Sequence, residues 1–253
     1  MWRVAAVAAS ILLAGSAPDS TFVAVMHDGD AAFQAFDNVT AWDNYSRAVA
    51  IDSTDCTALW KLARVCVDRA TASSGDERKD LLAQGEGHAR RSVALCPDSA
   101  DAHVALAIVL GRMTNDAGGK RKIALSKEVK SAAEAALAIE PQHPGALHIL
   151  GRWNFGIASL GWFERSIAKI VYGGVPPGAS MEQARSYFER AVAADPTAPL
   201  NHFWLGETLI KLDDYAGARA ELNECVALED VFWDDAVAKT RAQKRLKDIE
   251  GKQ

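Results

Sequence analysis

The chain has 253 residues, of which 49% are hydrophobic and 24% are charged, a composition that is ordinary for a soluble globular protein. Its 28 basic and 33 acidic residues give a formal net charge of −5, which disfavours nucleic acid as a main partner. Alanine is abundant, and the sequence lacks alternating runs rich in valine and isoleucine. The composition therefore favours an all-α fold.

The first 17 residues differ from the rest of the chain. Arg3 supplies a positive charge, Val4–Ala14 is a run of small and apolar residues, and Gly15–Ala17 provides small residues for a cleavage site. This pattern predicts a signal peptide over residues 1–17 and an exported, periplasmic or secreted protein. The alternative is an uncleaved, weakly membrane-associated start on a cytoplasmic protein.

The remaining chain is organised as a repeat. Five similar segments end at Ser53, Pro97, Pro141, Pro196 and Asp230, so the intervals between them are 44, 44, 55 and 34 residues. The last interval equals the length of a tetratricopeptide repeat, about 34 residues. One such unit cannot bury its apolar face alone, so several must stack. The sequence predicts an all-α, tetratricopeptide-like helical repeat solenoid over residues 29–250, after a flexible segment at 18–28.

The units also share an internal pattern of small and large residues. Leu150-Gly151 and Leu205-Gly206 occupy the Leu-Gly positions of two first helices. The matching second helices carry a small, a large and a small residue at fixed offsets: Ala184, Phe188 and Ala191, then Ala218, Leu222 and Cys225. Small residues let neighbouring helices approach, and large ones fill the gaps between pairs.

The two ends of the repeat domain carry single helices in this interpretation. Ala41, Tyr45 and Ala48 fit a second helix that no first helix precedes. Residues 234–252 predict a last helix, with Trp233 and Val237 packing to cap the stack. We therefore expect about four and a half helix pairs.

Three units are longer than the repeat requires, and the extra residues fall between their two helices. Thr71–Asp80 and Thr114–Ile123 are polar and predict long helix pairs with polar turns on one edge of the solenoid. The enlarged third unit instead contains the apolar stretch from 159 to 180. Its periodicity predicts an amphipathic insertion helix that packs on the domain or meets a partner or membrane surface. The residues that mark this helix are Trp162, Phe163, Arg165 and Lys169.

The segment LGRWNFGIASLGWFERSIAKIVYGGVPPGASMEQARSYFERAVAADP, residues 150–196, resembles the regulator of microtubule dynamics family. The resemblance rests on Leu150-Gly151-Arg152-Trp153, on Trp162 and on the enlarged unit as a whole. It implies a helical repeat domain that binds other proteins. Animal members are linked to microtubules and to mitochondrial or reticulum membranes. Together with the export signal, it indicates an exported bacterial relative. Tubulin would be a partner only if the chain were cytosolic instead.

The sequence contains no convincing catalytic, metal-binding or cofactor-binding constellation. His143 and His148, for example, lie five residues apart, which is not the spacing that points two imidazoles at one metal. We therefore expect a non-catalytic scaffold without a cofactor, whose partner is a protein or peptide. The alternatives are a microtubule-associated regulator, as the family resemblance implies, and, more remotely, an enzyme with an unrecognised site.

The first helix of each unit lines the concave groove in this repeat type. Arginines and aromatic rings along such a groove suit a peptide with an acidic group. In the alternative interpretation, the rings belong to the core and the arginines pair with their neighbours. The groove positions predicted from the repeat alignment are Trp60, Arg64, Arg112, His148, Arg152, Phe155 and Phe203.

The four cysteines fit no zinc-binding spacing. Cys56 opens the first helix of its unit and Cys96 closes the second, so their Cα atoms should lie close together. Cys66 and Cys225 are expected to be buried thiols. The sequence favours four buried thiols and leaves a Cys56–Cys96 disulfide open.

Overall fold

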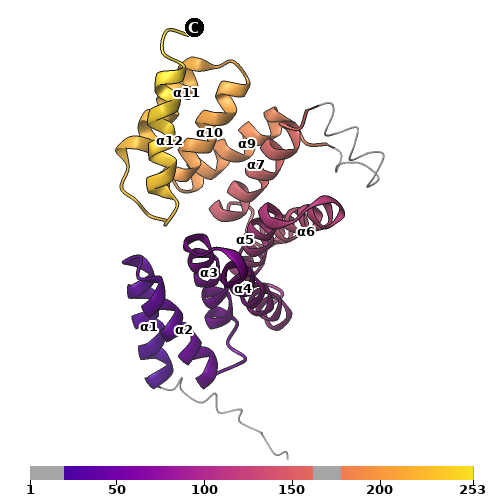
Figure 1. Ribbon diagram of the computed structural model, residues 1–253, viewed down its shortest axis with the longest axis vertical. Coiled ribbons are helices and arrows are strands. Elements are labelled where there is room, and N and C mark those ends of the chain that lie inside the picture. The colour runs from indigo at the N-terminus through magenta and orange to yellow at the C-terminus, as the bar shows by residue number, and fades with distance from the viewer. Residues whose placement is uncertain (1–19, 162–177, 253) are drawn as a thin grey trace, which may run out of the picture.

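A computed structural model describes residues 20–161 and 178–252 of the chain (Figure 1). This part contains eleven α-helices and no strand, which confirms the all-α prediction. The helices are α1 (Ser20–Gln34), α2 (Asn38–Ile51), α3 (Cys56–Ala72), α4 (Gly75–Leu95), α5 (Ala100–Asp116), α6 (Gly119–Ile139), α7 (Pro144–Ala158), α9 (Met181–Ala194), α10 (Pro199–Lys211), α11 (Tyr215–Ala227) and α12 (Asp235–Asp248).

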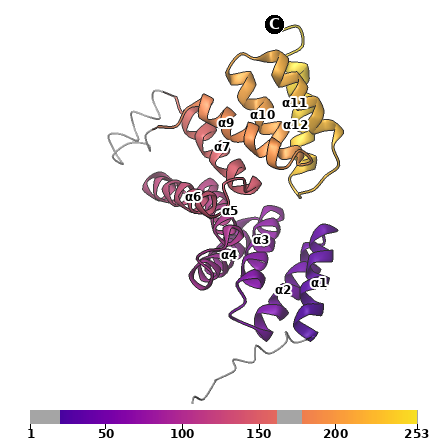
Figure 2. The same cartoon turned by 180° about the vertical axis from the view of Figure 1, so that it is seen from behind.

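Consecutive helices form hairpins that stack on one another. The hairpins are α1·α2, α3·α4, α5·α6, α7·α9 and α10·α11, and α12 packs on the last of them. The stack curves, so that the loop before α12 approaches the upper ends of α1 and α3 across the concave side (Figures 1 and 2). This is the predicted helical repeat solenoid. None of the described helices has both the length and the apolar character needed to cross a membrane.

Helix α1 corrects two expectations. Residues 20–28, expected to be flexible, are helical, and α1·α2 is a complete pair, so the described chain holds five pairs and α12. The enlarged unit is therefore the fourth pair, not the third. The physical reason is packing: Val25 is buried, and a Cβ atom on Gly29 would lie 2.6 Å from the Tyr45 ring. Asp30 also accepts a hydrogen bond of 2.6 Å from the Tyr45 hydroxyl.

The Leu-Gly positions work as predicted. A Cβ atom on Gly151 would lie 2.6 Å from the Phe188 ring, and one on Gly206 would lie 2.7 Å from Leu222. Both large side chains are fully buried. Each glycine therefore lets the second helix of its hairpin approach closely enough to bury one large side chain against it.

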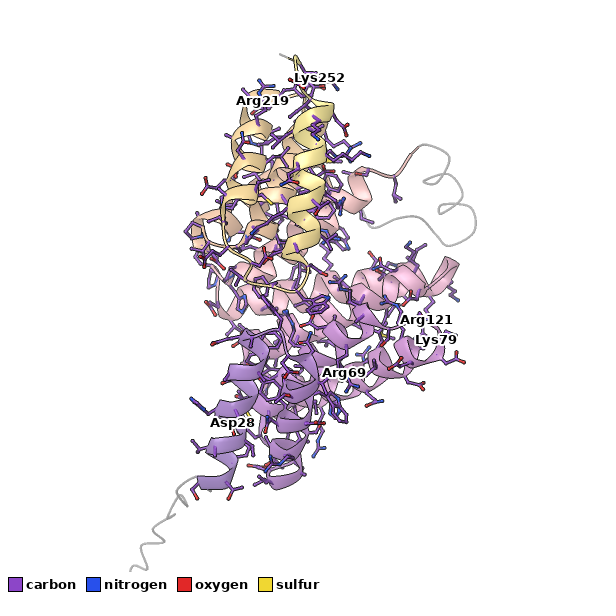
Figure 3. The ribbon with its side chains drawn as sticks, turned by 60° about the vertical axis from the view of Figure 1, so that its left-hand side comes forward. Asp28, Arg69, Lys79, Arg121, Arg219 and Lys252 are labelled. Carbon is purple, nitrogen blue, oxygen red and sulfur yellow. A yellow bond between two sulfur atoms is a disulfide. The ribbon has the colours of Figure 1, made fainter. Side chains whose placement is uncertain are left out.

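The two polar insertions lengthen their hairpins, as expected. Gly75 and Gly119 open α4 and α6 with φ values of +61° and +50°, a backbone region that glycine adopts at little cost. Arg78 joins the two turns, donating to Asp116 at 2.9 Å and to the Ala70 carbonyl at 2.7 Å. Figure 3 shows Lys79 and Arg121 on this edge of the stack. The predicted insertion helix, with Trp162, Phe163, Arg165 and Lys169, lies outside the described residues.

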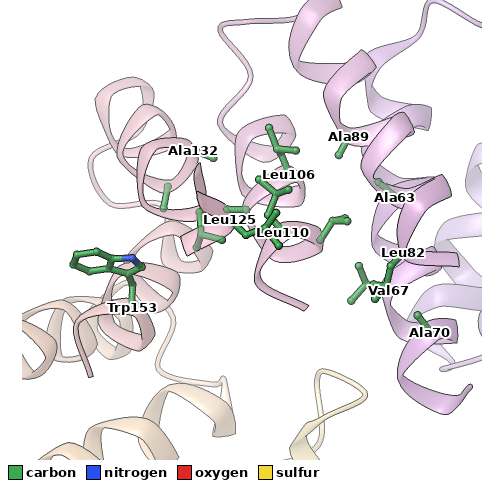
Figure 4. Packing of buried hydrophobic residues seen from close by; sticks show 14 of the residues in the cluster. Ala63, Val67, Ala70, Leu82, Ala89, Leu106, Leu110, Leu125, Ala132 and Trp153 are labelled. Carbon is green, nitrogen blue, oxygen red and sulfur yellow. The ribbon is translucent and has the colours of Figure 1, made fainter. Parts of the chain in front are cut away.

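The largest hydrophobic cluster among the described residues runs through α3, α4, α5, α6 and α7 (Figure 4). It contains Leu110, Leu125 and Leu150, and Figure 4 shows Trp153 at one side of it. The Trp153 indole N–H donates to the Ser126 carbonyl at 3.0 Å, so this buried polar atom is satisfied. The cluster holds the first helices in register, and these helices carry the site described below.

The cysteines divide into a bridge and two thiols. Cys56 and Cys96 form a disulfide with their Cα atoms 6.1 Å apart, so the expected proximity is confirmed and the four-thiol interpretation is wrong. The reason is the hairpin itself, which brings the start of α3 beside the end of α4. Cys66 and Cys225 are buried thiols, as predicted, and burial raises the pKa of Cys66 to about 11 and that of Cys225 to about 12.

Candidate functional site: the concave groove

The concave side of the stack holds a cavity of about 760 Å³. Its walls come from α3, α5, α7, the start of α6, the α1–α2 turn, the α9–α10 turn with the start of α10, and from the loop between α11 and α12. We call this last segment, residues 228–234, the crossing loop. The cavity is therefore lined by the first helices of four hairpins and by a segment near the other end of the chain. The arrangement of these elements can be followed in Figures 1 and 2.

Four of the seven predicted groove residues line this cavity: Arg64, Arg112, His148 and Arg152. They come from α3, α5 and α7, so the repeat alignment placed the right faces of these helices towards the concave side. The other three, Trp60, Phe155 and Phe203, are not among the lining residues. Trp60 is half-buried, with the Lys61 ammonium 5.6 Å from its ring centroid.

Phe203 is a correction, because it is a fully buried core residue. Helix α12 covers the face of α10 that the alignment assigned to the groove. The Arg241 guanidinium lies 4.6 Å from the Phe203 ring centroid, and Arg245 forms an ion pair with the buried Glu207. Phe155 is partly buried against the hydrophobic cluster that contains Phe203. It meets Trp204 edge to face, at 5.3 Å between ring centroids.

Trp204 is the aromatic residue that matters at this site, and the sequence prediction missed it. The Arg152 guanidinium stacks over the Trp204 ring, with its Cζ atom 3.9 Å from the centroid. This contact fixes the orientation of a long, flexible side chain. Trp204 directly follows Phe203, so a shift of one position in the α10 alignment would have found it.

Arg152 carries a positive charge inside a positively charged groove. Its side chain is open to water, but the surrounding protein removes part of its hydration. This desolvation, together with the neighbouring Arg112 and Arg241, lowers the pKa of Arg152 to about 10. The guanidinium remains charged at neutral pH, and the lowered pKa reflects its desolvation first and the two neighbouring arginines second.

The other two arginines have different environments. Arg112 forms an ion pair with Asp234 of the crossing loop, 122 residues later in the chain. The Nε atom of Arg64 is buried and has no hydrogen-bond partner in the part of the chain that the structure describes. Asp68 lies one helical turn from Arg64, and burial raises the pKa of its carboxyl group. A buried N–H without a partner is uncommon and marks a position where an acceptor would be favourable.

His148 is neutral. Burial, with Arg152 and Arg112 nearby, lowers its pKa to about 3. Its Nδ1 atom lies 2.8 Å from the Asn201 Oδ1 atom, and Asn201 donates through Nδ2 to the Ala191 carbonyl. This arrangement makes Nδ1 the donor, so Nε2 carries a lone pair and can accept a hydrogen bond.

The crossing loop brings apolar side chains to the cavity. Val231, Phe232 and Trp233 line it, yet they remain 42%, 36% and 43% exposed. The expected cap formed by Trp233 and Val237 is therefore wrong, since Val237 is also exposed. Instead, α12 caps the stack by burying Ala238, Ala242 and Ile249.

Nothing in the described residues adds a metal site. Within 20–161 and 178–252, no three histidine, cysteine, aspartate or glutamate side chains gather in a way that could hold a metal ion. The chemistry that the cavity offers is recognition: guanidinium groups, one neutral imidazole and an apolar wall.

The family model described as Regulator of microtubule dynamics protein 1-3 matches residues 25–250. The chain belongs to this family. A bovine regulator of microtubule dynamics protein 1 is 35% identical over 164 residues, which cover 64% of this chain and 51% of the relative. The Caenorhabditis elegans protein of the same name is 28% identical over 191 residues, covering 76% of this chain and 84% of the relative. This family member thus spans about half the length of the mammalian relatives it matches.

Solved structures show the same fold in more distant proteins. A thermophilic tetratricopeptide-repeat protein from Thermus thermophilus aligns with a TM-score of 0.65 at 15% identity, covering 88% of this chain and 99% of the other. The PilF protein of Pseudomonas aeruginosa aligns with a TM-score of 0.57 at 15% identity, covering 92% and 93%. The family member is thus a tetratricopeptide-like helical repeat protein, a fold that suggests a scaffold for protein interactions.

Proposed function

We propose that this chain is a non-catalytic scaffold that binds a peptide or protein segment in its concave groove, through an acidic group on the partner. One observation carries the proposal: Arg64 and Arg152 face the cavity, and neither forms an ion pair with a described residue. A guanidinium group matches the two oxygens of a carboxylate, and such charge-assisted hydrogen bonds are stronger than neutral ones.

The surroundings support an anionic group more than a cationic one. The charges that lower the pKa values of His148 and Arg152 would stabilise a carboxylate at the same position. The Trp204 ring holds Arg152 in place before any partner arrives, so less side-chain entropy is lost on binding. Apolar residues such as Ile108, Ile149 and Leu200 offer area for neighbouring side chains of the partner.

Replacing Arg152 by alanine should weaken partner binding by about 1–3 kcal/mol, because a charge-assisted hydrogen bond is lost. The measurement is calorimetric titration with a partner recovered by pull-down with the whole chain. Arg185→Ala is the matched control, since Arg185 is an arginine paired with Glu189 on the outside of α9 and is not part of the cavity wall. Unchanged affinity, with intact circular dichroism, would contradict the site. A lowered melting temperature instead would indicate a structural role.

We also propose that the chain is exported. Two features support this: the apolar N-terminal pattern of residues 1–17, and the Cys56–Cys96 disulfide, a bond that persists in oxidising compartments and is rare in the cytosol. The second candidate is a microtubule-associated regulator in the cytosol, which the names of the matched relatives favour.

Thiol mapping of protein taken directly from cells should separate these two candidates. For an exported protein, Cys56 and Cys96 become alkylated only after reduction, while Cys66 and Cys225 become alkylated after denaturation alone. Cys66 and Cys225 thus serve as internal controls for access to buried thiols. The opposite outcome is that all four cysteines become alkylated without reduction and that the protein is found in a cytosolic fraction that sediments with microtubules. This outcome would favour the second candidate and contradict export.

A further inference from the structure

We infer that the groove's partner is a short segment in which an acidic residue adjoins large apolar side chains, and that the crossing loop is an internal copy of it which the partner must displace. This inference rests on the proposed function and names the chemistry of its partner. The crossing loop carries the sequence Glu-Asp-Val-Phe-Trp-Asp over residues 229–234.

The first observation is where this loop lies. Val231, Phe232, Trp233 and Asp234 all line the cavity, whose other walls include α3, α5 and α7. Asp234 pairs with Arg112 of α5, so its carboxylate engages one of the three groove arginines. An acidic residue and two aromatic residues of the same chain thus already sit in the site proposed for an acidic partner.

The second observation is that the loop is only partly docked. Val231, Phe232 and Trp233 remain more than one third exposed, although all three line the cavity. Large apolar side chains exposed side by side are uncommon on a protein surface without a partner. Shallow burial means that little stabilisation is lost when the loop moves away from α5.

The third observation is the charge balance of the cavity. Four cationic residues line it, Arg64, Arg112, Lys122 and Arg152, against the three acidic residues Asp68, Asp195 and Asp234. Departure of the loop removes one acidic group and leaves Arg112 without its partner. Even in its docked position, the loop provides no hydrogen-bond acceptor for the Arg64 Nε atom. A segment with two acidic groups could engage both arginines and would therefore outcompete the loop.

The base of the loop is held by its own unit and not by the groove. The Asp235 carboxylate accepts hydrogen bonds from the backbone N–H groups of Val231 and Phe232, at 2.8 and 2.6 Å. Lys239 pairs with Asp230 at 2.6 Å. These bonds keep the loop in shape after it leaves Arg112, so the Asp234–Arg112 pair is the contact that decides whether the loop occupies the groove.

An occupant tethered in this way competes at an effective concentration on the order of millimolar. The apparent affinity of the free partner falls in proportion to the fraction of molecules whose groove is open. Removing Asp234 should therefore tighten binding of an added acidic segment. The Asp234 side chain makes no capping hydrogen bond to α12, so its replacement leaves the helix start intact.

The test uses the full chain and a labelled, end-capped hexapeptide with the sequence of residues 229–234. Asp234→Ala should bind this hexapeptide about five- to tenfold more tightly than the unaltered protein. Amide hydrogen exchange at residues 233 and 234 should also become faster. Asp248→Ala is the matched control, because Asp248 is an acidic residue of α12 that pairs with Arg245 away from the cavity; it should change neither quantity. Adding Arg112→Ala to the Asp234→Ala variant should weaken hexapeptide binding at least tenfold relative to Asp234→Ala alone.

The outcomes distinguish this inference from the proposed function. If Asp234→Ala and the unaltered protein bind the hexapeptide equally, the loop does not compete and the inference is overturned, while the pull-down partner and Arg152→Ala still decide the proposed function. Failure of the hexapeptide to bind Asp234→Ala at all overturns the assigned partner chemistry. Faster exchange together with tighter binding supports both parts of the inference.

Discussion

Phe188→Ala is expected to lower the free energy of unfolding by about 3–5 kcal/mol, because it removes a fully buried ring that the surrounding hairpins cannot collapse to replace. The ring packs on Gly151 within its own hairpin and meets the His148 imidazole edge to face, at 5.8 Å between centroids. Urea denaturation followed by circular dichroism measures the change. A loss below about 1 kcal/mol would contradict the close packing of α7 on α9.

The same contact can be tested from the glycine side. Gly151→Ala should cost about 1–3 kcal/mol, since the added methyl group would overlap the Phe188 ring. Combined with Phe188→Ala, its additional cost should shrink, because the methyl group then enters vacated space. Gly87→Ala in α4 is the control: nothing lies within 4 Å of the position its Cβ would take, so that variant should be neutral or slightly stabilising. Equal effects of Gly151→Ala and Gly87→Ala would contradict the contact.

Loss of the Cys56–Cys96 disulfide should lower stability by about 4 kcal/mol, the chain-entropy value for a bridge whose ends are 40 residues apart. The variant that replaces both cysteines by alanine should unfold at lower urea concentration than the oxidised protein. Adding a reductant should lower the midpoint of the unaltered protein and leave that of the double variant unchanged. A reductant effect on the double variant, or none on the unaltered protein, would contradict the bridge.

Much of the fold could be predicted because the sequence pairs a small residue in one helix with a large residue in the helix that packs against it. Gly206 and Leu222 lie 16 positions apart, and Gly151 and Phe188 have the same spacing once the 21 inserted residues are left out. In each pair the small residue faces the large one, and the closest approach of each hairpin follows. Helix α1 was missed because Asp28 stands where the pattern has leucine, which leaves Gly29 alone as the signal. Gly29 nevertheless precedes Tyr45 by the same interval that separates Gly206 from Leu222.

The candidate site was predictable only as far as local periodicity reaches. Arg64, Arg112 and Arg152 line the cavity from the first helices of their units, as the repeat alignment predicted. The prediction for Phe203 was wrong because the exposure of this residue depends on how α12 packs over α10, which no pattern within α10 encodes. The meeting of Arg112 with Asp234 joins positions 122 residues apart and follows from the curvature of the whole stack, which accumulates from small rotations between hairpins.

Helix α1 has a consequence for maturation of the chain. A peptidase that cuts after Ala17 would release a product whose first helix begins only three positions downstream, at Ser20. The contacts of the described residues that hold the first hairpin together, from Val25 to the Asp30 carboxylate that binds both Tyr45 and Lys61, all lie downstream of this cut. A cut or an engineered start a few residues further on would instead strip turns from α1 and leave the underlying face of α2 open to water. The cleavage site can therefore move downstream by less than one helical turn before the first hairpin begins to lose residues of α1.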